Sequence, residues 1–108
     1  MAVTTTADEY RLATFHFESK AYTDAARLLE GVLAEEPGNL SVRLLLARSY
    51  YHSAQLGRAE EELRRILDAD PAEAYARLML GRTLERRGRA AEARPHLRMA
   101  AAMTGEDL

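Results

Sequence analysis

The sequence predicts an all-α fold made of three successive helix pairs, six antiparallel helices in all. Alanine and leucine are abundant among its 108 residues, whereas glycine occurs 6 times and proline 3 times, and this composition favours helices. A 34-residue interval separates Pro37 from Pro71. When the sequence is shifted by this interval, several independent columns align apolar residues with apolar residues. The chain is therefore predicted to be an internal repeat.

The aligned columns define the expected core. One helix pair cannot bury its apolar face alone, so stacking of the next pair completes the core, which then runs along the whole stack. Its expected members come from both helices of each pair: Leu12, Ala13, Ala25, Leu29, Val32, Leu33, Leu46, Ala47, Tyr50, Ala59, Leu63, Ile66, Leu67, Leu80, Gly81, Leu84, Ala93 and Leu97.

The first helix pair is expected within residues 6–39. A capping box can form at Thr6-Ala7-Asp8-Glu9, at the start of the first helix. The break between the two helices falls at residues 20–24, where Thr23 or Asp24 can cap the second helix. Pro37 ends the pair, because proline cannot donate the backbone hydrogen bond that a continuing helix needs.

The second and third pairs are expected within residues 40–73 and 74–107. The second pair breaks at residues 54–57 and ends at Pro71, and its second helix contains the i,i+4 pairs Glu60–Arg64 and Glu61–Arg65. The third pair breaks around Gly88. Pro95 lies about one turn inside its last helix, where it either delays the start of that helix or bends it.

These columns resemble those of the tetratricopeptide repeat family, whose unit is a 34-residue antiparallel helix pair. The family places a bulky apolar residue before Gly or Ala in the first helix, Ala in the second helix and Pro at the end. Three columns depart from it. Glu9, Arg43 and Arg77 stand where the family has Trp, and of the three aromatic positions only Tyr50 matches. Gly105 stands where the third unit should end in Pro. The resemblance implies a right-handed α-solenoid, a single domain over residues 1–108 with units at 6–39, 40–73 and 74–107.

Composition and motifs argue against several functions. The chain has no cysteine, so disulfides, thiolate catalysis and Cys-ligated zinc are excluded. His16, His52 and His96 are scattered: His16 falls in a core column and the other two are expected at the surface. The run Glu60-Glu61-Glu62 is expected to face solvent. We therefore expect no catalytic residue, no metal and no cofactor, and the protein is predicted not to be an enzyme.

The same reasoning bears on membranes and nucleic acids. A sequence pI of about 5.9 argues against nucleic-acid binding. The alternative, that the seven arginines of residues 74–107 follow a phosphate backbone, requires them to share one face. No apolar run approaches the roughly 20 residues that a bilayer requires, and the first residues do not form a secretory signal. A cytoplasmic protein that neither spans nor binds membranes is expected.

The resemblance implies that the first helices of the units line a concave groove that holds a peptide or a partner's helix. Arg48 and Arg82 occupy equivalent positions and could together bind a carboxylate, so an acidic or amphipathic ligand is expected. The family's clamp for acidic chaperone tails is absent, because Leu45 and Met79 replace two of its polar residues. The groove residues are Tyr10, Thr14, Phe17, Leu44, Arg48, Tyr51, Tyr75, Leu78, Arg82 and Glu85. The alternative is that these side chains only pack the core.

A second hypothesis is self-association into a homodimer or larger homo-oligomer through the last helix. An uncovered apolar flank would form there, and such flanks recruit partner surfaces. Its residues are Leu97, Met99, Ala100, Ala101 and Met103. The formal charge runs from −4 in residues 1–39 through −1 in 40–73 to +3 in 74–108, which could orient head-to-tail contacts. The alternative is that these charges only solvate helix surfaces.

Overall fold

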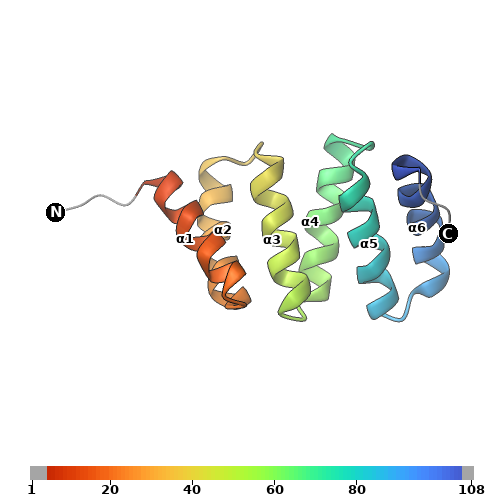
Figure 1. Cartoon of the computed structure of the whole chain (residues 1–108), viewed down its shortest axis with the longest axis horizontal. Helices are drawn as coiled ribbons and strands as arrows, with labels where there is room; N and C mark the ends of the chain where they lie inside the picture. The colour runs from red at the N-terminus through yellow and green to blue at the C-terminus, as the bar shows by residue number, and fades with distance from the viewer. Residues whose placement is uncertain (1–4, 106–108) are drawn as a thin grey trace.

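The computed structural model describes residues 5–105, which form six α-helices and no strand (Figure 1). This confirms the predicted all-α fold. Equivalent helices begin at the predicted 34-residue interval, at positions 6, 40 and 74 and at positions 22, 56 and 90. In chain order the helices are α1 (Thr6–Glu18), α2 (Tyr22–Glu35), α3 (Leu40–His52), α4 (Leu56–Ala69), α5 (Ala74–Arg86) and α6 (Ala90–Thr104).

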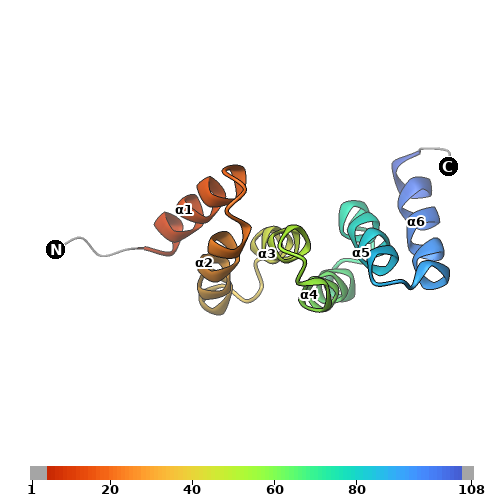
Figure 2. The same ribbon diagram turned by 90° about the horizontal axis from the view of Figure 1, so that it is seen from below.

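The helices stack along one axis into an elongated helical solenoid that measures 53 × 24 × 21 Å. Each helix packs mainly against the helix before it and the helix after it in the chain. With the long axis of the stack horizontal, α1, α3 and α5 lie on one side and α2 and α4 on the other, with α6 at the end (Figure 2). Contacts are therefore made almost entirely between neighbours, as in other repeat proteins.

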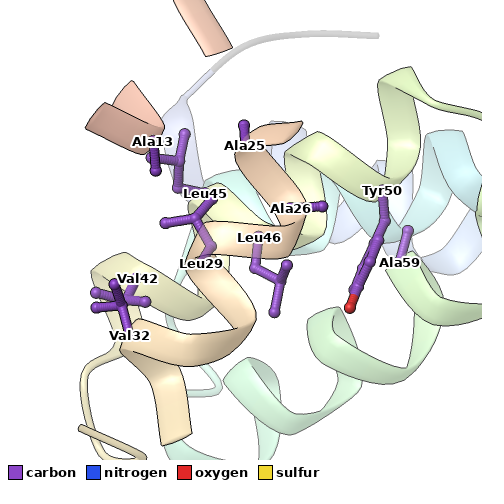
Figure 3. Packing of buried hydrophobic residues seen from close by; sticks show 10 residues of the cluster. All are labelled: Ala13, Ala25, Ala26, Leu29, Val32, Val42, Leu45, Leu46, Tyr50 and Ala59. Atoms are coloured by element: carbon purple, nitrogen blue, oxygen red, sulfur yellow. The ribbon is translucent and has the colours of Figure 1, made fainter. Parts of the chain in front are cut away.

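The buried residues form two overlapping clusters. The first joins α1 to α4 and includes the fully buried Ala13, Ala25, Leu29 and Ala59 (Figure 3). The second joins α3 to α6 around Leu63 and its neighbours. Alanines at the closest approaches let the helices lie near one another, while leucines fill the wider spaces.

Most of the predicted core is buried, but Leu12 is not. Its side chain is 47% exposed, whereas its equivalents Leu46 and Leu80 are 2% and 1% exposed. The reason is positional, because α3 and α5 each pack on a preceding helix pair and α1 has none among the described residues. Leu33 and Leu97 are only partly buried.

Two buried hydroxyl groups were not predicted to lie in the core. Ser49 and Thr83 occupy equivalent positions and are both fully buried. The Ser49 hydroxyl donates to the Leu45 carbonyl at 2.8 Å, and the Thr83 hydroxyl donates to the Met79 carbonyl at 2.7 Å. A bond to the carbonyl four residues earlier satisfies each hydroxyl without a partner from another helix.

The helix starts differ from the predicted caps. The capping box at α1 uses Thr5 with Asp8 instead of beginning at Thr6. The prediction that Thr23 or Asp24 caps α2 is wrong, because the N-cap is Ala21 and makes no side-chain hydrogen bond. The amide of Ala21 donates to the His16 carbonyl at 2.8 Å, which satisfies an acceptor at the end of α1. The Ala21 carbonyl accepts from the Ala25 amide at 2.9 Å, so the second helix starts before Thr23 and Asp24.

Pro95 does not delay the last helix. The sixth helix begins at Ala90, which is equivalent to the first residues of α2 and α4, and Pro95 lies inside it. Close packing between α5 and α6 depends on Gly81, since a Cβ atom built there would lie 2.5 Å from Cδ2 of Leu97.

The expectation that Glu60, Glu61 and Glu62 all face solvent is wrong for two of the three. Glu60 is 8% exposed and Glu62 is 7% exposed. The Glu60 carboxylate accepts from Arg64 at 3.0 Å, from Arg87 at 2.8 Å and from Arg89 at 2.7 Å. The three arginines come from α4 and from the turn between α5 and α6, so this buried carboxylate ties two helix pairs together.

Glu62 joins the two helices of the second pair. It accepts from Arg43 of α3 at 2.6 Å and from Arg65, three residues later in α4, at 2.9 Å. Arg65 therefore pairs with Glu62, and the predicted Glu61–Arg65 pair is not formed. The predicted Glu60–Arg64 pair is confirmed.

Candidate functional site on the face formed by α1, α3 and α5

The side of the stack formed by α1, α3 and α5 is called the odd-helix face. These three helices lie beside one another along the length of the molecule (Figures 1 and 2). All the residues predicted for the groove are on these helices. Because the helices repeat at 34-residue intervals, equivalent residues form rows along this face.

Arg48 is at the middle of the odd-helix face. Its guanidinium carbon lies 4.6 Å from the ring centroid of Phe17 in α1 and 5.6 Å from that of Tyr75 in α5. Both distances are typical of cation–π contacts. One arginine of the middle pair is thus held by aromatic rings from the pairs on either side of it.

The hydrogen-bonding groups of Arg48 are not used within the described chain. Its Nε atom is buried without a partner, and no carboxylate of residues 5–105 forms a salt bridge with its guanidinium. A guanidinium offers five N–H donors in a planar fork that matches a carboxylate. Arg48 is therefore a positioned cation with donors left for a ligand.

Arg86 and Tyr51 form a second cation–π pair beside it. The Arg86 guanidinium carbon lies 4.6 Å from the Tyr51 ring centroid, and Nη1 of Arg86 donates to the Tyr51 carbonyl oxygen at 2.9 Å. This contact fixes α5 to the end of α3. Sequence analysis did not single out Arg86, because only its spatial proximity to Tyr51 reveals the pair.

His52, at the end of α3, is exposed and contacts three aromatic rings. Its ring stacks on Tyr22 with centroids 4.7 Å apart and meets Phe17 and Tyr51 edge to face. Burial lowers the pKa of His52, and the positive charges of Arg48 and Arg86 lower this pKa further. The imidazole is consequently neutral near pH 7, and the arginines supply the positive charge here.

Several predicted groove residues are also packing residues. Tyr10 and Phe17 pack against the first core cluster, Leu44 packs against the second, and Tyr51 packs against both. The Thr14 hydroxyl donates to the Tyr10 carbonyl at 3.0 Å. The most exposed aromatic ring of the set is Tyr75, which is 41% exposed.

Arg82 does not have the surroundings of its equivalent, Arg48. Nη1 of Arg82 lies 3.1 Å from Oε1 of Glu85, three residues later on the same helix. Both members of this pair are largely exposed. Of the two arginines, only Arg48 combines aromatic contacts with the lack of an ion-pair partner in the described chain.

A hollow of about 430 Å³ lies at the C-terminal end of the stack, between α5 and α6, and is called the terminal hollow. It contains three predicted groove residues and one residue predicted for self-association, Leu97. Met99 and Met103 are 48% and 39% exposed but do not line it. The lining is Ala74, Tyr75, Leu78, Arg82, Arg94, Leu97, Arg98, Ala100, Ala101 and Thr104.

Sequence analysis placed Ala100 and Ala101 in the apolar flank of the last helix but did not place Arg94 and Arg98 beside them. Ala100 and Ala101 align with Val32 and Leu33 in α2 and with Ile66 and Leu67 in α4. In the earlier pairs these positions face the next helix of the stack.

Metal sites and membrane spans are not found in residues 5–105. This part of the chain holds no group of three or more His, Asp or Glu side chains that could bind a metal ion. None of its helices combines the length and the apolar character needed to cross a membrane.

Comparison with known proteins agrees with this architecture. The family model described as "Tetratricopeptide repeat" matches residues 16–79. No curated protein matches the chain.

Solved structures of MamA are similar to this chain. A MamA point mutant is 24% identical with a TM-score of 0.87, and the match covers 94% of this chain and 74% of that one. MamA from Desulfovibrio magneticus RS-1 is 25% identical with a TM-score of 0.85, over 92% of this chain and 56% of that one. A MamA structure designated MSR-1 is 22% identical with a TM-score of 0.88, and the match covers 94% of this chain and 58% of that one. The chain therefore spans between about half and three quarters of these proteins.

Proposed function

Because this chain belongs to the tetratricopeptide repeat family, we propose that it is a non-catalytic, cytoplasmic protein-interaction module that binds its ligand on the odd-helix face. The expected ligand is a peptide or a partner's helix with an acidic or amphipathic character. The observation that carries this proposal is Arg48, whose guanidinium lies between Phe17 and Tyr75 and has no ion-pair partner in the described chain.

The chemistry of Arg48 selects a carboxylate. Cation–π contacts with two rings restrict the Arg48 side chain, so less side-chain freedom is lost when a ligand carboxylate accepts two parallel hydrogen bonds from it. Tyr75 and Leu78 lie further along the same face and provide apolar area for a neighbouring ligand side chain. An acidic residue followed at helical spacing by an apolar one fits both features.

Peptide selection tests this proposal. The full chain would be used to select binders from a displayed library of random peptides, and the affinity of a selected peptide would be measured by calorimetry. We expect enrichment of Asp and Glu. Arg48→Ala should weaken binding by about tenfold or more, since a charge-assisted bidentate contact contributes roughly 1.5–3 kcal/mol.

Two further variants make the result specific. Arg48→Lys keeps the charge but lacks the planar fork, so it should recover only part of the affinity. Arg65→Ala removes an exposed arginine of α4 and should leave peptide affinity unchanged. Equal affinities for wild type and Arg48→Ala would contradict binding through Arg48.

The terminal hollow favours a second candidate function, self-association. It is an open, mainly apolar surface lined by Leu97, with Met99 and Met103 exposed nearby on the same helix. An apolar surface of this kind at the end of a repeat stack is a binding surface for another helix. In this second proposal the chain is a structural subunit that forms homo-oligomers through its last helix.

A further inference from the structure

One face of α1 differs from the same face of α3 and α5. The head face of α1 consists of Asp8, Arg11, Leu12 and Phe15. The equivalent residues of α3 are Val42, Leu45, Leu46 and Ser49, all buried where α3 packs on the preceding pair, and those of α5 are buried in the same way. In α1, by contrast, Leu12 is 47% exposed and Phe15 is 61% exposed. The head face is thus a packing surface without its partner in the described chain.

The terminal hollow is the complementary surface. Leu97, Ala100 and Ala101 occupy the positions through which α2 and α4 support the next odd-numbered helix. For example, Val32 of α2 packs in the same cluster as Val42 of α3, at the junction of the first two pairs (Figure 3). The hollow therefore offers the seat that a seventh helix of the same stack would occupy.

The ion pair between the second and third helix pairs predicts how a further helix pair would align with the terminal hollow. Nη2 of Arg64 in α4 lies 2.8 Å from Oε1 of Glu92 in α6, which joins the second pair to the third. One repeat further along, Arg98 is the equivalent of Arg64, and the residue of the first pair equivalent to Glu92 is Asp24. If a second copy continued the stack, Asp24 of that copy would face Arg98.

Both residues are available for this pairing. Arg98 is exposed and lines the terminal hollow. The Asp24 side chain is 57% exposed, and its ion pair within the described chain is a long one, 3.8 Å to Arg27. The overall charge also favours attraction between the first pair of one copy and the third pair of another, because the first pair is acidic and the third pair is basic.

We propose that the terminal hollow of one copy receives α1 of a second copy, head to tail, and that the 34-residue stack continues across the junction. Leu12 and Phe15 of the incoming α1 supply the apolar contact, and Asp24 in α2 of the same copy pairs with Arg98. This proposal rests on the second candidate function and does not involve Arg48. Because the two joined surfaces are different, each bound copy leaves a head and a tail free, and assembly gives open chains.

The composition of the head face predicts a reversible association. Asp8 and Arg11 stand where α3 has Val42 and Leu45, so half of the surface stays polar. Polar groups of this kind lose hydrating water on binding and therefore add little to the free energy of association. We therefore expect the assembly to form with rising protein concentration and to weaken with added salt, which screens the Asp24–Arg98 pair.

Charge reversal tests the register of the junction. The weight-average mass of the full chain would be measured by sedimentation across micromolar to millimolar concentrations. Asp24→Arg and Arg98→Glu should each raise the concentration at half-association by roughly threefold to tenfold, because each replaces attraction with repulsion at an exposed pair. The double variant Asp24→Arg/Arg98→Glu should return to within about twofold of wild type. Glu61→Arg, the same charge change at an exposed site of α4, should have little effect.

Phe15→Glu tests the apolar contact and should abolish association, while the exposure of Phe15 leaves the fold intact, as a thermal melt would verify. A mass that stays monomeric at all concentrations would overturn the proposal. So would association that persists in Phe15→Glu or that the double variant does not restore, since the copies would then meet through other surfaces. Peptide binding at Arg48 is measured separately and at protein concentrations below those of association, because Tyr75 and Leu78 line the terminal hollow as well as the proposed peptide site.

Discussion

At the scale of single residues, the position of a side chain in the stack decides what it contributes. Leu12, Leu46 and Leu80 occupy one column of the repeat, yet the first is about half exposed and the other two are buried. The same residue type in the same column of the repeat therefore has different energetic roles. The difference arises from the preceding helix pair, which covers α3 and α5 but not α1.

This difference can be measured with alanine substitutions in one column. Leu46→Ala should lower the free energy of unfolding by about 2–5 kcal/mol, because it removes buried methyl groups and leaves a cavity. Leu12→Ala is the matched control and should cost less than about 1 kcal/mol, as exposed substitutions do. Urea denaturation of both variants checks the prediction, and similar losses at the two sites would contradict the burial assigned to Leu12.

Ala59 belongs to the column of small residues at the closest helix contacts and is fully buried. Ala59→Leu should overpack this contact and lower the free energy of unfolding by roughly 1–3 kcal/mol. Ala34→Leu, at an exposed position of α2, provides the control and should be close to neutral. A melting temperature of Ala59→Leu at or above that of wild type would show that the contact has room for a larger side chain.

At the scale of elements, the three turns within the helix pairs share one backbone conformation. The second residue after each odd-numbered helix has a positive φ angle: 64° at Lys20, 61° at Ala54 and 77° at Gly88. Only glycine adopts this region without a steric cost, and the other two turns bear that cost. The turn is therefore imposed by the packing of the helices it connects.

Gly88→Ala should lower the free energy of unfolding by about 1 kcal/mol, since the left-handed conformation becomes strained. A Cβ at Gly88 would meet no atom within 4 Å, so the effect reports on the backbone and not on a clash. Gly38→Ala is a suitable control, because this glycine is equally open and is not among the positive-φ residues. It should be neutral or stabilising by about a few tenths of a kcal/mol. Denaturant unfolding of both variants checks this prediction, and equal changes in the free energy of unfolding would contradict a strained backbone at Gly88.

The Glu60 cluster links elements that are distant in the chain. Glu60→Gln should lower the free energy of unfolding by about 1–2 kcal/mol, because it weakens three charge-assisted hydrogen bonds, while the partly exposed arginines can still be hydrated. Glu61→Gln alters an exposed neighbour and should change stability little. Chemical denaturation distinguishes the two, and equal effects would show that the cluster does not stabilise the junction.

At the scale of the whole molecule, stability should fall as the pH is lowered, in two steps. Burial and nearby arginines hold the pKa values of His52 and His96 below the ordinary 6.5. The unfolded chain therefore binds more protons than the folded chain just below pH 6.5, and folding weakens there. For Glu60, burial acts to raise the pKa, but bonds from arginines outweigh it and hold this pKa below 4.5.

The second step should follow below about pH 4.5, as Glu60 becomes protonated on unfolding and then in the folded state. Denaturant unfolding at a series of pH values checks both steps. The variant His52→Gln/His96→Gln should flatten the first step and leave the second in place. A wild-type stability that is constant between pH 7 and pH 5 would contradict the lowered histidine pKa values.

The repeat interval made the architecture predictable from sequence. Columns such as Ala25 and Ala59 report directly on helix contacts, because a helix buries the same face wherever its neighbours repeat. The turns between helices and the ends of the helix pairs could be predicted from the same repeat. The helices begin at the 34-residue interval even where a local signal pointed elsewhere, as at Pro95.

The sites could not be predicted as fully, because they depend on long side chains that reach between helix pairs. Arg48 lies between a ring of the preceding helix pair and a ring of the following one, whereas the equivalent Arg82 pairs with Glu85. Glu60 is buried because three arginines converge on it from α4 and from the turn after α5. Periodicity specifies which helices meet, since that depends on local backbone geometry and apolar faces. The tertiary structure decides which charged atoms come within reach of one another and which end faces remain uncovered.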